Sequence, residues 1–558
     1  MSEESKKDKF VKRLMKDKYG VSNAAVNYYL VLMFTVFPLF FTQKYSNIRH
    51  DKLNVFVALS CALFFIVGVT WLISYFEKKR VGALPEEKWY KNLSVTDYAF
   101  GALILLYIIS TIFARIPIEA VTGSTGRNNG LMAFIMYFFV YIVLSRFFKV
   151  KEYVFVALAL GSLAVYLLAI LNFFYIDVFR IFGVEAGIYY GYSDATIKDF
   201  ISTIGNKNIM SALCCLTIPP LIMLFINSET KRLKYLYLVS GGVGFSAMLC
   251  SDSESGFLGL VPLLALVLLF YSRDVARLRK FFTALCAMFV SSKLLVVVVA
   301  VTKALAESEI IKTLFVYDKK TLMEKGIDKG FGTMQTLFIS DNKCFLIIAV
   351  TAALAFGLWF LEKKKPDFTV PKFVPYALAA VYGLGVAFLA GLFVRYSFID
   401  TKSKLDGIMT FFRFDEKWGT HRGYMWIKAG EIFKNTNWKN KLIGSGPDTF
   451  YMMFSPYFSE LSHKFHNSTT NCAHNEFLNY LITTGILGLG AYLTIFISAV
   501  VRSVKTAAKN PLSVVFIAPV VCYLFQSVVN IANPEVTPLL FIFLALSEAI
   551  VRTEKTNN

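Results

Sequence analysis

Apolar residues along this chain form long runs that are separated by shorter polar connectors. We identify about fourteen runs, most of them roughly 18–24 residues long, which lets a helix cross a hydrocarbon core of about 30 Å. Backbone groups cannot stay unpaired in lipid, so the runs are predicted to be helices. The pattern therefore predicts an all-α polytopic membrane protein of about 14 transmembrane helices. The predicted spans are 24–43, 53–76, 96–114, 130–148, 153–175, 207–227, 235–251, 255–271, 281–301, 344–361, 373–394, 476–500, 512–532 and 536–550.

Lysine and arginine gather in every second connector. Short basic loops stay on the cytoplasmic side, so both termini are predicted to be cytoplasmic and the alternate connectors extracytoplasmic. The basic clusters lie within 6–18, 78–91, 149–151, 231–234, 273–280, 363–365, 502–509 and 552–555. The longer connector 302–343 is also rich in lysine, but the rule weakens with loop length and we place it outside. Topology thus accounts for the net charge of +20, and no nucleic-acid partner is expected.

One polar segment, 395–475, is the longest interruption of a chain that is 56% hydrophobic and 17% charged. It holds four of the five histidines and is predicted to be an extracytoplasmic catalytic loop between helices 11 and 12. The predicted organisation is a cytoplasmic segment 1–23, eleven helices within 24–394, the loop 395–475, three helices within 476–550 and a cytoplasmic tail 551–558.

Arginines on the predicted outer side are more informative than the inner clusters, because topology does not explain them. Arg127 lies in a Gly-rich stretch, 123–130, while Arg413 and Arg422 lie in the large loop. Arginine is always charged and can bind phosphate oxygens as a fork, and nearby glycines let backbone N–H groups approach an anion. These residues are candidates for binding a lipid-linked phosphate. Contact with lipid headgroups, or a solvated loop, is the alternative for each of them.

His474 is predicted to lie at the start of the twelfth span, followed by Asn475 and Glu476. Its ordinary pKa, near 6.5, suits a general base that deprotonates a sugar hydroxyl. A histidine that only rests at the membrane interface is an equal alternative. His463, His466 and His474 lack the accompanying carboxylates or cysteines of a metal site, so no metal is predicted. Without a Walker loop or dinucleotide motif, neither a nucleotide-driven pump nor any cofactor is expected.

Within the large loop, 422–434 has the apolar spacing of a helix, with Arg422 and Trp426 on one face. This helix either lies flat on the membrane surface or packs against its own loop. Asn206 opens the sixth span and is expected to be a helix cap. The eight cysteines form no disulfide framework, and Cys472 is expected to be a packed thiol rather than a nucleophile.

Several motifs together resemble the O-antigen ligase and O-antigen polymerase superfamily of membrane glycosyltransferases. The motifs are GSTGRNNGL at 123–131, GNKN at 205–208, SDSESGFLGL at 251–260, RGYMWIKA at 422–429, IGSGPDTF at 443–450 and HNEFLNYLITTGILGL at 474–489. Each motif is weak alone, but the last three in this order are more specific.

The resemblance implies a metal-independent enzyme that uses a polyprenyl-diphosphate-linked glycan as donor. It implies that the residue matching His474 is the base and that outer arginines hold the diphosphate, with Arg422 first and Arg127 and Arg413 after it. Asn475, Glu476 and Trp426 are further candidates for substrate binding. The family often has arginine where this chain has Glu254. Either another basic residue, for which Lys207 is the candidate, takes over that phosphate contact, or the acceptor chemistry differs.

The main hypothesis is therefore transfer of a glycan from a polyprenyl diphosphate to an acceptor hydroxyl on the outer face of the cytoplasmic membrane, during assembly of a surface polysaccharide such as a capsule. Expected partners are the lipid bilayer, the lipid-linked donor, an acceptor glycan, lipid or protein, and other polysaccharide-assembly proteins. The alternatives are a flippase for the same lipid-linked glycans and a non-catalytic assembly partner. A flippase is expected to carry charges inside its spans, where only Lys293 stands out.

Overall fold

The computed structural model describes residues 3–42, 48–80, 82, 92–124, 127–176, 184–185, 188–189, 202–307, 331–366, 368–466 and 470–556. Most of the predicted outer connector 302–343 lies outside these residues. The same holds for Lys88 and Lys91 of a predicted cytoplasmic cluster, and for the middle of the stretch 123–130.

Each of the predicted spans coincides with a helix. These helices are α1 (Glu3–Leu39), α2 (Ile48–Arg80), α3 (Val95–Ile112), α5 (Leu131–Phe147), α6 (Glu152–Phe173), α8 (Lys207–Asn227), α9 (Lys231–Cys250), α10 (Ser255–Tyr271), α11 (Val275–Glu307), α14 (Lys343–Lys364), α15 (Phe373–Val394), α20 (Glu476–Thr506), α21 (Leu512–Ser527) and α22 (Thr537–Thr556). The connectors hold α4 (Pro117–Thr122), β1 (Val184–Glu185), β2 (Ile188–Tyr189), η2 (Ser202–Ile204), α13 (Thr333–Gln335) and η4 (Thr336–Ser340).

The helices fit a protein that crosses the membrane several times. In the described part of the chain, 10 helices are long and apolar enough to span a bilayer, and α5, α10 and α21 are apolar but shorter. Apart from the antiparallel pair of two-residue strands β1 and β2, the regular elements among the described residues are helices. The multi-pass, helical class is as predicted, whereas the count of fourteen spans stays a prediction.

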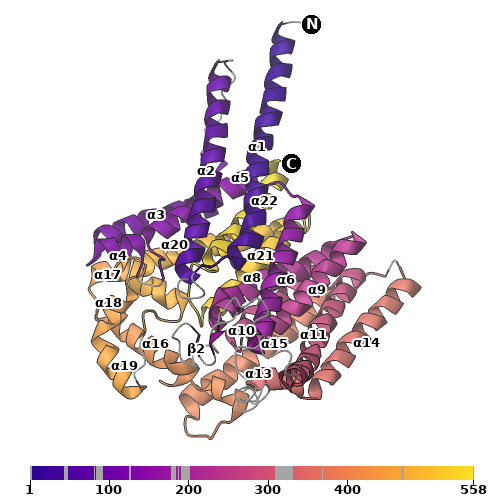
Figure 1. Ribbon diagram of the computed structural model, residues 1–558, viewed down its shortest axis with the longest axis vertical. Coiled ribbons are helices and arrows are strands. Elements are labelled where there is room, and N and C mark those ends of the chain that lie inside the picture. Colours follow the sequence, from indigo (N-terminus) through magenta and orange to yellow (C-terminus); the bar gives the residue numbers. More distant parts are fainter. Residues whose placement is uncertain are drawn as a thin grey trace.

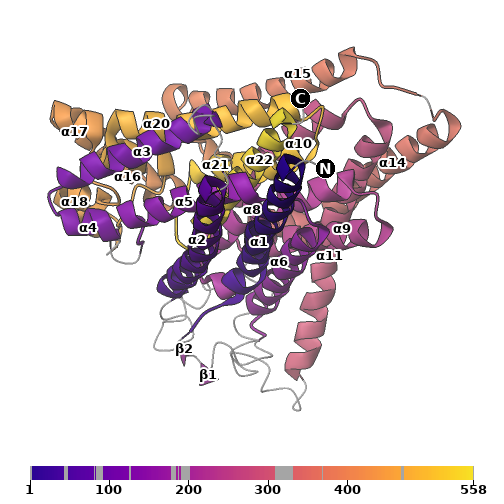
Figure 2. The same cartoon turned by 90° about the horizontal axis from the view of Figure 1, so that it is seen from above.

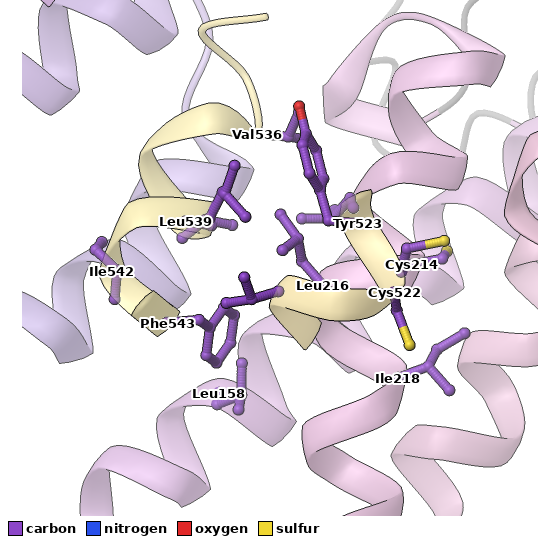
Figure 3. Packing of buried hydrophobic residues seen from close by; sticks show 14 of the residues in the cluster. Leu158, Cys214, Leu216, Ile218, Cys522, Tyr523, Val536, Leu539, Ile542 and Phe543 are labelled. Carbon is purple, nitrogen blue, oxygen red and sulfur yellow. The ribbon is translucent and has the colours of Figure 1, made fainter. Parts of the chain in front are cut away.

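Helix α8 lies at the centre of the main hydrophobic core. Its residues from Ile209 to Ile226 are all buried, and it packs against α9, α10 and α21. Figure 3 shows Cys214, Leu216 and Ile218 of α8 near Cys522 and Tyr523 of α21. A helix that is apolar on every side belongs inside a bundle, and α8 follows that rule.

Helices α14 and α15 lie at the margin of the bundle (Figure 2). None of the residues of α15 is buried, and its Tyr382 hydroxyl donates to the carbonyl of Val261 in α10 at 3.1 Å. The apolar side chains of α15 therefore face the surroundings, as expected of a helix that contacts lipid.

Lys293, the charged residue in the middle of α11, has a local structural partner. Its Nζ donates to the carbonyls of Ile339 at 2.7 Å, Ser340 at 3.3 Å and Asp341 at 3.1 Å. A cation at the end of a helical turn satisfies carbonyls that lack partners there. The position of Lys293 is thus explained by the turn η4 that it contacts.

Helix α20 is broken at Gly485, where φ is 71° and ψ is −175°. The break leaves the carbonyls of Ile482 and Thr483 without helical partners, and such groups cannot stay unpaired in lipid. The turn after α17 (Trp438–Ile443) supplies donors: Ser445 N–H donates to Ile482 at 3.2 Å, and Gly446 N–H donates to Thr483 at 3.0 Å. These bonds fasten the large polar segment to α20.

The polar segment 395–475 folds into short helices with a hydrophobic cluster of their own. Besides α17 they are η5 (Arg395–Ile399), η6 (Gly407–Phe412), α16 (Trp418–Asn435), α18 (Phe450–Phe454), η7 (Ser455–Tyr457) and α19 (Phe458–Lys464). Tyr424, Met425 and Ala429 of α16 are buried with Phe454 and Phe465. Of the two arrangements left open for 422–434, these contacts support the helix that packs against its own loop. In Figure 1, α16 and α19 lie in the lower half and both chain ends in the upper half.

Candidate functional site

His474 lies in a tight turn directly before α20, as the sequence predicts. Its φ of 47° is left-handed, and its side chain is half-buried. Asn475 caps α20, since its side chain accepts from Leu478 N–H at 3.0 Å. On the other side of His474, the indole N–H of Trp426 donates to the carbonyl of Ala473 at 2.9 Å. The turn is therefore held by a helix cap on one side and by α16 on the other.

Cys472 is the buried neighbour of His474. The hydroxyl of Thr470 donates to the Cys472 carbonyl at 2.7 Å, which fixes the backbone here. Burial alone raises the pKa of the Cys472 thiol, but Arg127 outweighs it together with His474, whose side chain hydrogen-bonds the sulfur, and the pKa falls to about 6. The fold therefore favours the thiolate form of Cys472.

Arg127 reaches this turn from the connector before α5. It is only 5% exposed, and its Nε donates to the side-chain oxygen of Asn471 at 3.1 Å. The adjoining backbone is held by a carboxylate from the large segment. Asp448 accepts from Ser124 N–H at 2.9 Å, Ser124 Oγ at 3.2 Å and Asn129 N–H at 3.2 Å.

Asp448 itself is buried in the stretch that follows the glycines 444 and 446. Burial raises its pKa, while Arg127 and the N–H groups of Asn129 and Ser124 act in the opposite direction. A buried carboxylate needs such partners, because charge transferred out of water is costly unless it is paired. Asp448 thus joins two parts of the chain that are far apart in sequence.

Arg422 lies near Cys472 of the turn but is held differently from Arg127. Within the described residues, no hydrogen bond or ion pair engages its half-buried guanidinium. Burial lowers the pKa of Arg422, and Cys472 and Glu254 act against it, so both groups lie near the guanidinium. The donors of Arg422 are therefore available to a bound anion.

The backbone before Arg422 is unusual. Gly419, Thr420 and His421 have φ values of 58°, 61° and 71°, which are left-handed. A left-handed conformation costs a residue with a Cβ about 1–2 kcal/mol, and such strain clusters at functional sites. The strained turn therefore marks the residue that follows it, Arg422, as one whose direction the fold specifies.

The turn that carries Glu254 is joined to the start of α8. Ser253 Oγ donates to the side-chain oxygen of Asn208 at 2.8 Å. Asn206 caps α8 as predicted, accepting from Asn208 N–H at 2.9 Å and Ile209 N–H at 3.3 Å. Lys207 is the first residue of α8, so it lies beside this turn.

Glu476 points into the helix bundle rather than towards the loop. It is 1% exposed and accepts hydrogen bonds from the hydroxyls of Tyr492 and Tyr523. The guanidinium of Arg413 is bonded to the carbonyls of Ser403 and Asp400 within its own loop. Neither residue contacts His474 through a described hydrogen bond.

The site thus gathers Arg127, Arg422 and Trp426 around the turn 471–475, and places Arg413 apart from it. Sequence reasoning assigned no role to Asn471 or Asp448. The available signal was that Asp448 lies within the motif IGSGPDTF at 443–450, on which part of the family resemblance rests. In the described part of the chain, no group of three or more His, Cys, Asp or Glu residues could hold a metal ion.

These features define a class: a multi-pass helical membrane protein with a polar segment that folds over a histidine turn at a helix start. Residues 333–493 match the family model described as O-antigen ligase. The match supports the predicted resemblance to the O-antigen ligase and polymerase superfamily. It covers under a third of the chain, including Arg422 and His474 but neither Arg127 nor Lys207. A search of curated proteins finds no match.

Proposed function

We propose that the protein is a membrane glycosyltransferase that moves a glycan from a polyprenyl diphosphate to an acceptor hydroxyl. The observation that carries this proposal is the half-buried His474 turn near Arg422, whose guanidinium makes no hydrogen bond or ion pair with the described residues. Both residues lie within the segment that matches the family. One residue suits proton transfer and the other suits a phosphate, which are the two needs of this reaction.

In the proposed reaction, His474 accepts the proton of the acceptor hydroxyl as its oxygen bonds to the anomeric carbon. The bond from that carbon to the diphosphate oxygen breaks, the anomeric centre inverts, and polyprenyl diphosphate leaves. The Cys472 thiolate, hydrogen-bonded to the His474 side chain, fixes the imidazole tautomer and stabilises the imidazolium that forms. The other ring nitrogen then faces the acceptor.

Arg422 provides the complementary charge. Negative charge builds on the leaving diphosphate while the glycosyl centre gains oxocarbenium character. A guanidinium already in place stabilises that charge without reorganising during the reaction. Its partial burial strengthens the effect, because electrostatic interactions are larger away from bulk water.

We place the site on the outer face of the cytoplasmic membrane, with both termini in the cytoplasm. The alternating basic connectors support this orientation. No nucleotide is available there, and cleavage of the lipid-linked diphosphate provides the driving force. Lys207 is proposed as a further phosphate contact, since it adjoins the turn of Glu254 that approaches Arg422.

The test is transfer by the purified protein in liposomes that contain a polyprenyl-diphosphate-linked oligosaccharide and candidate acceptors. His474→Ala removes the base, and we expect kcat to fall by about 10²–10⁴-fold. Arg422→Ala removes the charge that stabilises the leaving group, and we expect kcat to fall by about 10²–10³-fold.

The matched control for the first change is His463→Ala, because His463 is an exposed histidine of α19 in the same segment. It should retain transfer activity. Full activity of both His474→Ala and Arg422→Ala would refute the site. Movement of the glycan across the liposome membrane without any transfer would instead identify a transporter.

A further inference from the structure

Arg127 differs from Arg422 in how its charge is balanced. Four groups that can carry negative charge interact electrostatically with Arg127: Asp448, Cys472, Glu476 and Glu535. An arginine that is 5% exposed requires such compensation, because an unpaired buried charge is costly. Groups of the protein that can carry negative charge therefore already lie near this guanidinium.

A diphosphate that approached Arg127 would also approach these acidic groups. Like charges repel strongly where water is largely excluded. Arg422 offers a better site for the diphosphate. Its guanidinium makes no hydrogen bond or ion pair among the described residues, and two such groups, Cys472 and Glu254, interact with it electrostatically rather than four. The two arginines thus have different tasks.

Among the described residues, one side-chain hydrogen bond of Arg127 is seen, and it indicates the task of this residue. Its Nε donates to the side chain of Asn471, the residue before Cys472 and three before His474. Asp448 in turn holds the backbone on both sides of Arg127 through Ser124 and Asn129. A chain of contacts therefore runs from Asp448 through Arg127 to the histidine turn.

We propose that Arg127 is a positioning residue that holds the turn 471–475 through Asn471, and that it does not bind the donor diphosphate. This inference rests on the proposed glycosyl transfer for its kinetic meaning. Its structural part, the restraint of the turn, can be measured whether or not the protein transfers glycans.

The structural test measures alkylation of individual cysteines by mass spectrometry in the full-length protein. Cys472 is buried in the turn, while Cys214 and Cys522 are buried in the helix bundle and report global unfolding. Arg127→Lys keeps the charge but removes the Nε bond, and Asn471→Ala removes its partner. We expect alkylation of Cys472 to rise about tenfold or more in both variants, with Cys214 and Cys522 still protected.

Asn471→Asp is the matched control, because it keeps an oxygen acceptor for Arg127 and should keep Cys472 protected. Unchanged protection of Cys472 in Arg127→Lys and Asn471→Ala would overturn the proposal. If Arg127→Lys also exposes the two bundle cysteines, it has unfolded, and Asn471→Ala decides the question.

The kinetic test uses the lipid-linked oligosaccharide as donor. A positioning role predicts that Arg127→Lys lowers kcat about tenfold or more while the donor KM changes by less than about threefold. Arg422→Lys should instead raise the donor KM. A raised donor KM in Arg127→Lys with Cys472 still protected would identify Arg127 as a diphosphate ligand and overturn the proposal. Absence of transfer by the unmodified protein would refute the proposed function alone, because alkylation still reports the turn.

Discussion

The Cys472 thiol interacts electrostatically with two residues of the site, Arg127 and His474. Arg127 and His474 lower its pKa from 9.0 to about 6 against the effect of burial, so the folded protein favours the thiolate. A group whose pKa is lowered on folding contributes stability in full above its unfolded pKa and loses that contribution as the pH falls through its folded pKa. The relevant window is therefore pH 9 to pH 6.

This linkage gives a prediction for Cys472→Ser, which removes the titrating group but keeps a small polar side chain. The thermal unfolding midpoint of the unchanged protein should rise relative to the variant as the pH increases from 6 to 9, because the thiolate is retained only by the folded state. Differential scanning fluorimetry in detergent over this range measures the difference. A difference that stays constant with pH would contradict the lowered pKa.

The sequence could locate His474 because a histidine at the end of a polar segment, directly before an apolar run, is a local pattern. The partners of its turn could not be found in this way. Asn471 is recognised as part of the site by its hydrogen bond to Arg127. Asp448 is recognised by its hydrogen bonds to Ser124 and Asn129. These partners are far apart along the chain. Such pairs depend on how loops pack, which hydrophobic periodicity does not encode.

At the scale of elements, apolar runs predicted helices well, since α8, α10 and α15 cover the expected stretches 207–227, 255–271 and 373–394. The break in α20 was not foreseen. A glycine inside an apolar run is compatible with a continuous helix. The non-helical conformation of Gly485 is explained by the backbone at the end of α17, which packs closely against it.

The break leads to a prediction for Gly485→Ala. A Cβ there would lie 2.3 Å from the carbonyl carbon of Leu442, in a backbone conformation that only glycine readily adopts. We expect a loss of about 2 kcal/mol or more in stability, together with reduced transfer activity, because the turn would be pushed from α20. Thermal unfolding in detergent measures the first effect.

Gly490→Ala is the control in the same helix, because a Cβ at Gly490 meets nothing within 4 Å. Alanine is favoured over glycine in a helix by about 1 kcal/mol, so this variant should be as stable as the unchanged protein or more so. Equal thermal stability of Gly485→Ala and Gly490→Ala would show that the close contact at Gly485 does not affect the stability of the protein.

For the whole molecule, the predicted orientation places two exposed residues, Trp438 and Lys79, on opposite sides of the membrane. Trp438 of the large segment is 75% exposed, and Lys79 is an exposed residue near the end of α2. In a protein whose exposed Cys61 is replaced by serine, a membrane-impermeant maleimide should label Trp438→Cys in intact cells. Lys79→Cys should be labelled only after permeabilisation, because basic connectors stay in the cytoplasm. Labelling of Lys79→Cys but not of Trp438→Cys in intact cells would show that the protein has the opposite orientation.

The break in α20 also bears on how the protein adapts to its membrane. Helices respond to bilayers of different thickness by tilting. In a continuous helix such a tilt would carry the His474 turn along with it. Because the first part of α20 is fastened to the turn of Ser445 and Gly446, the remainder can tilt about Gly485 while His474 keeps its distance from Arg422. We therefore expect the geometry of the site to depend little on lipid composition.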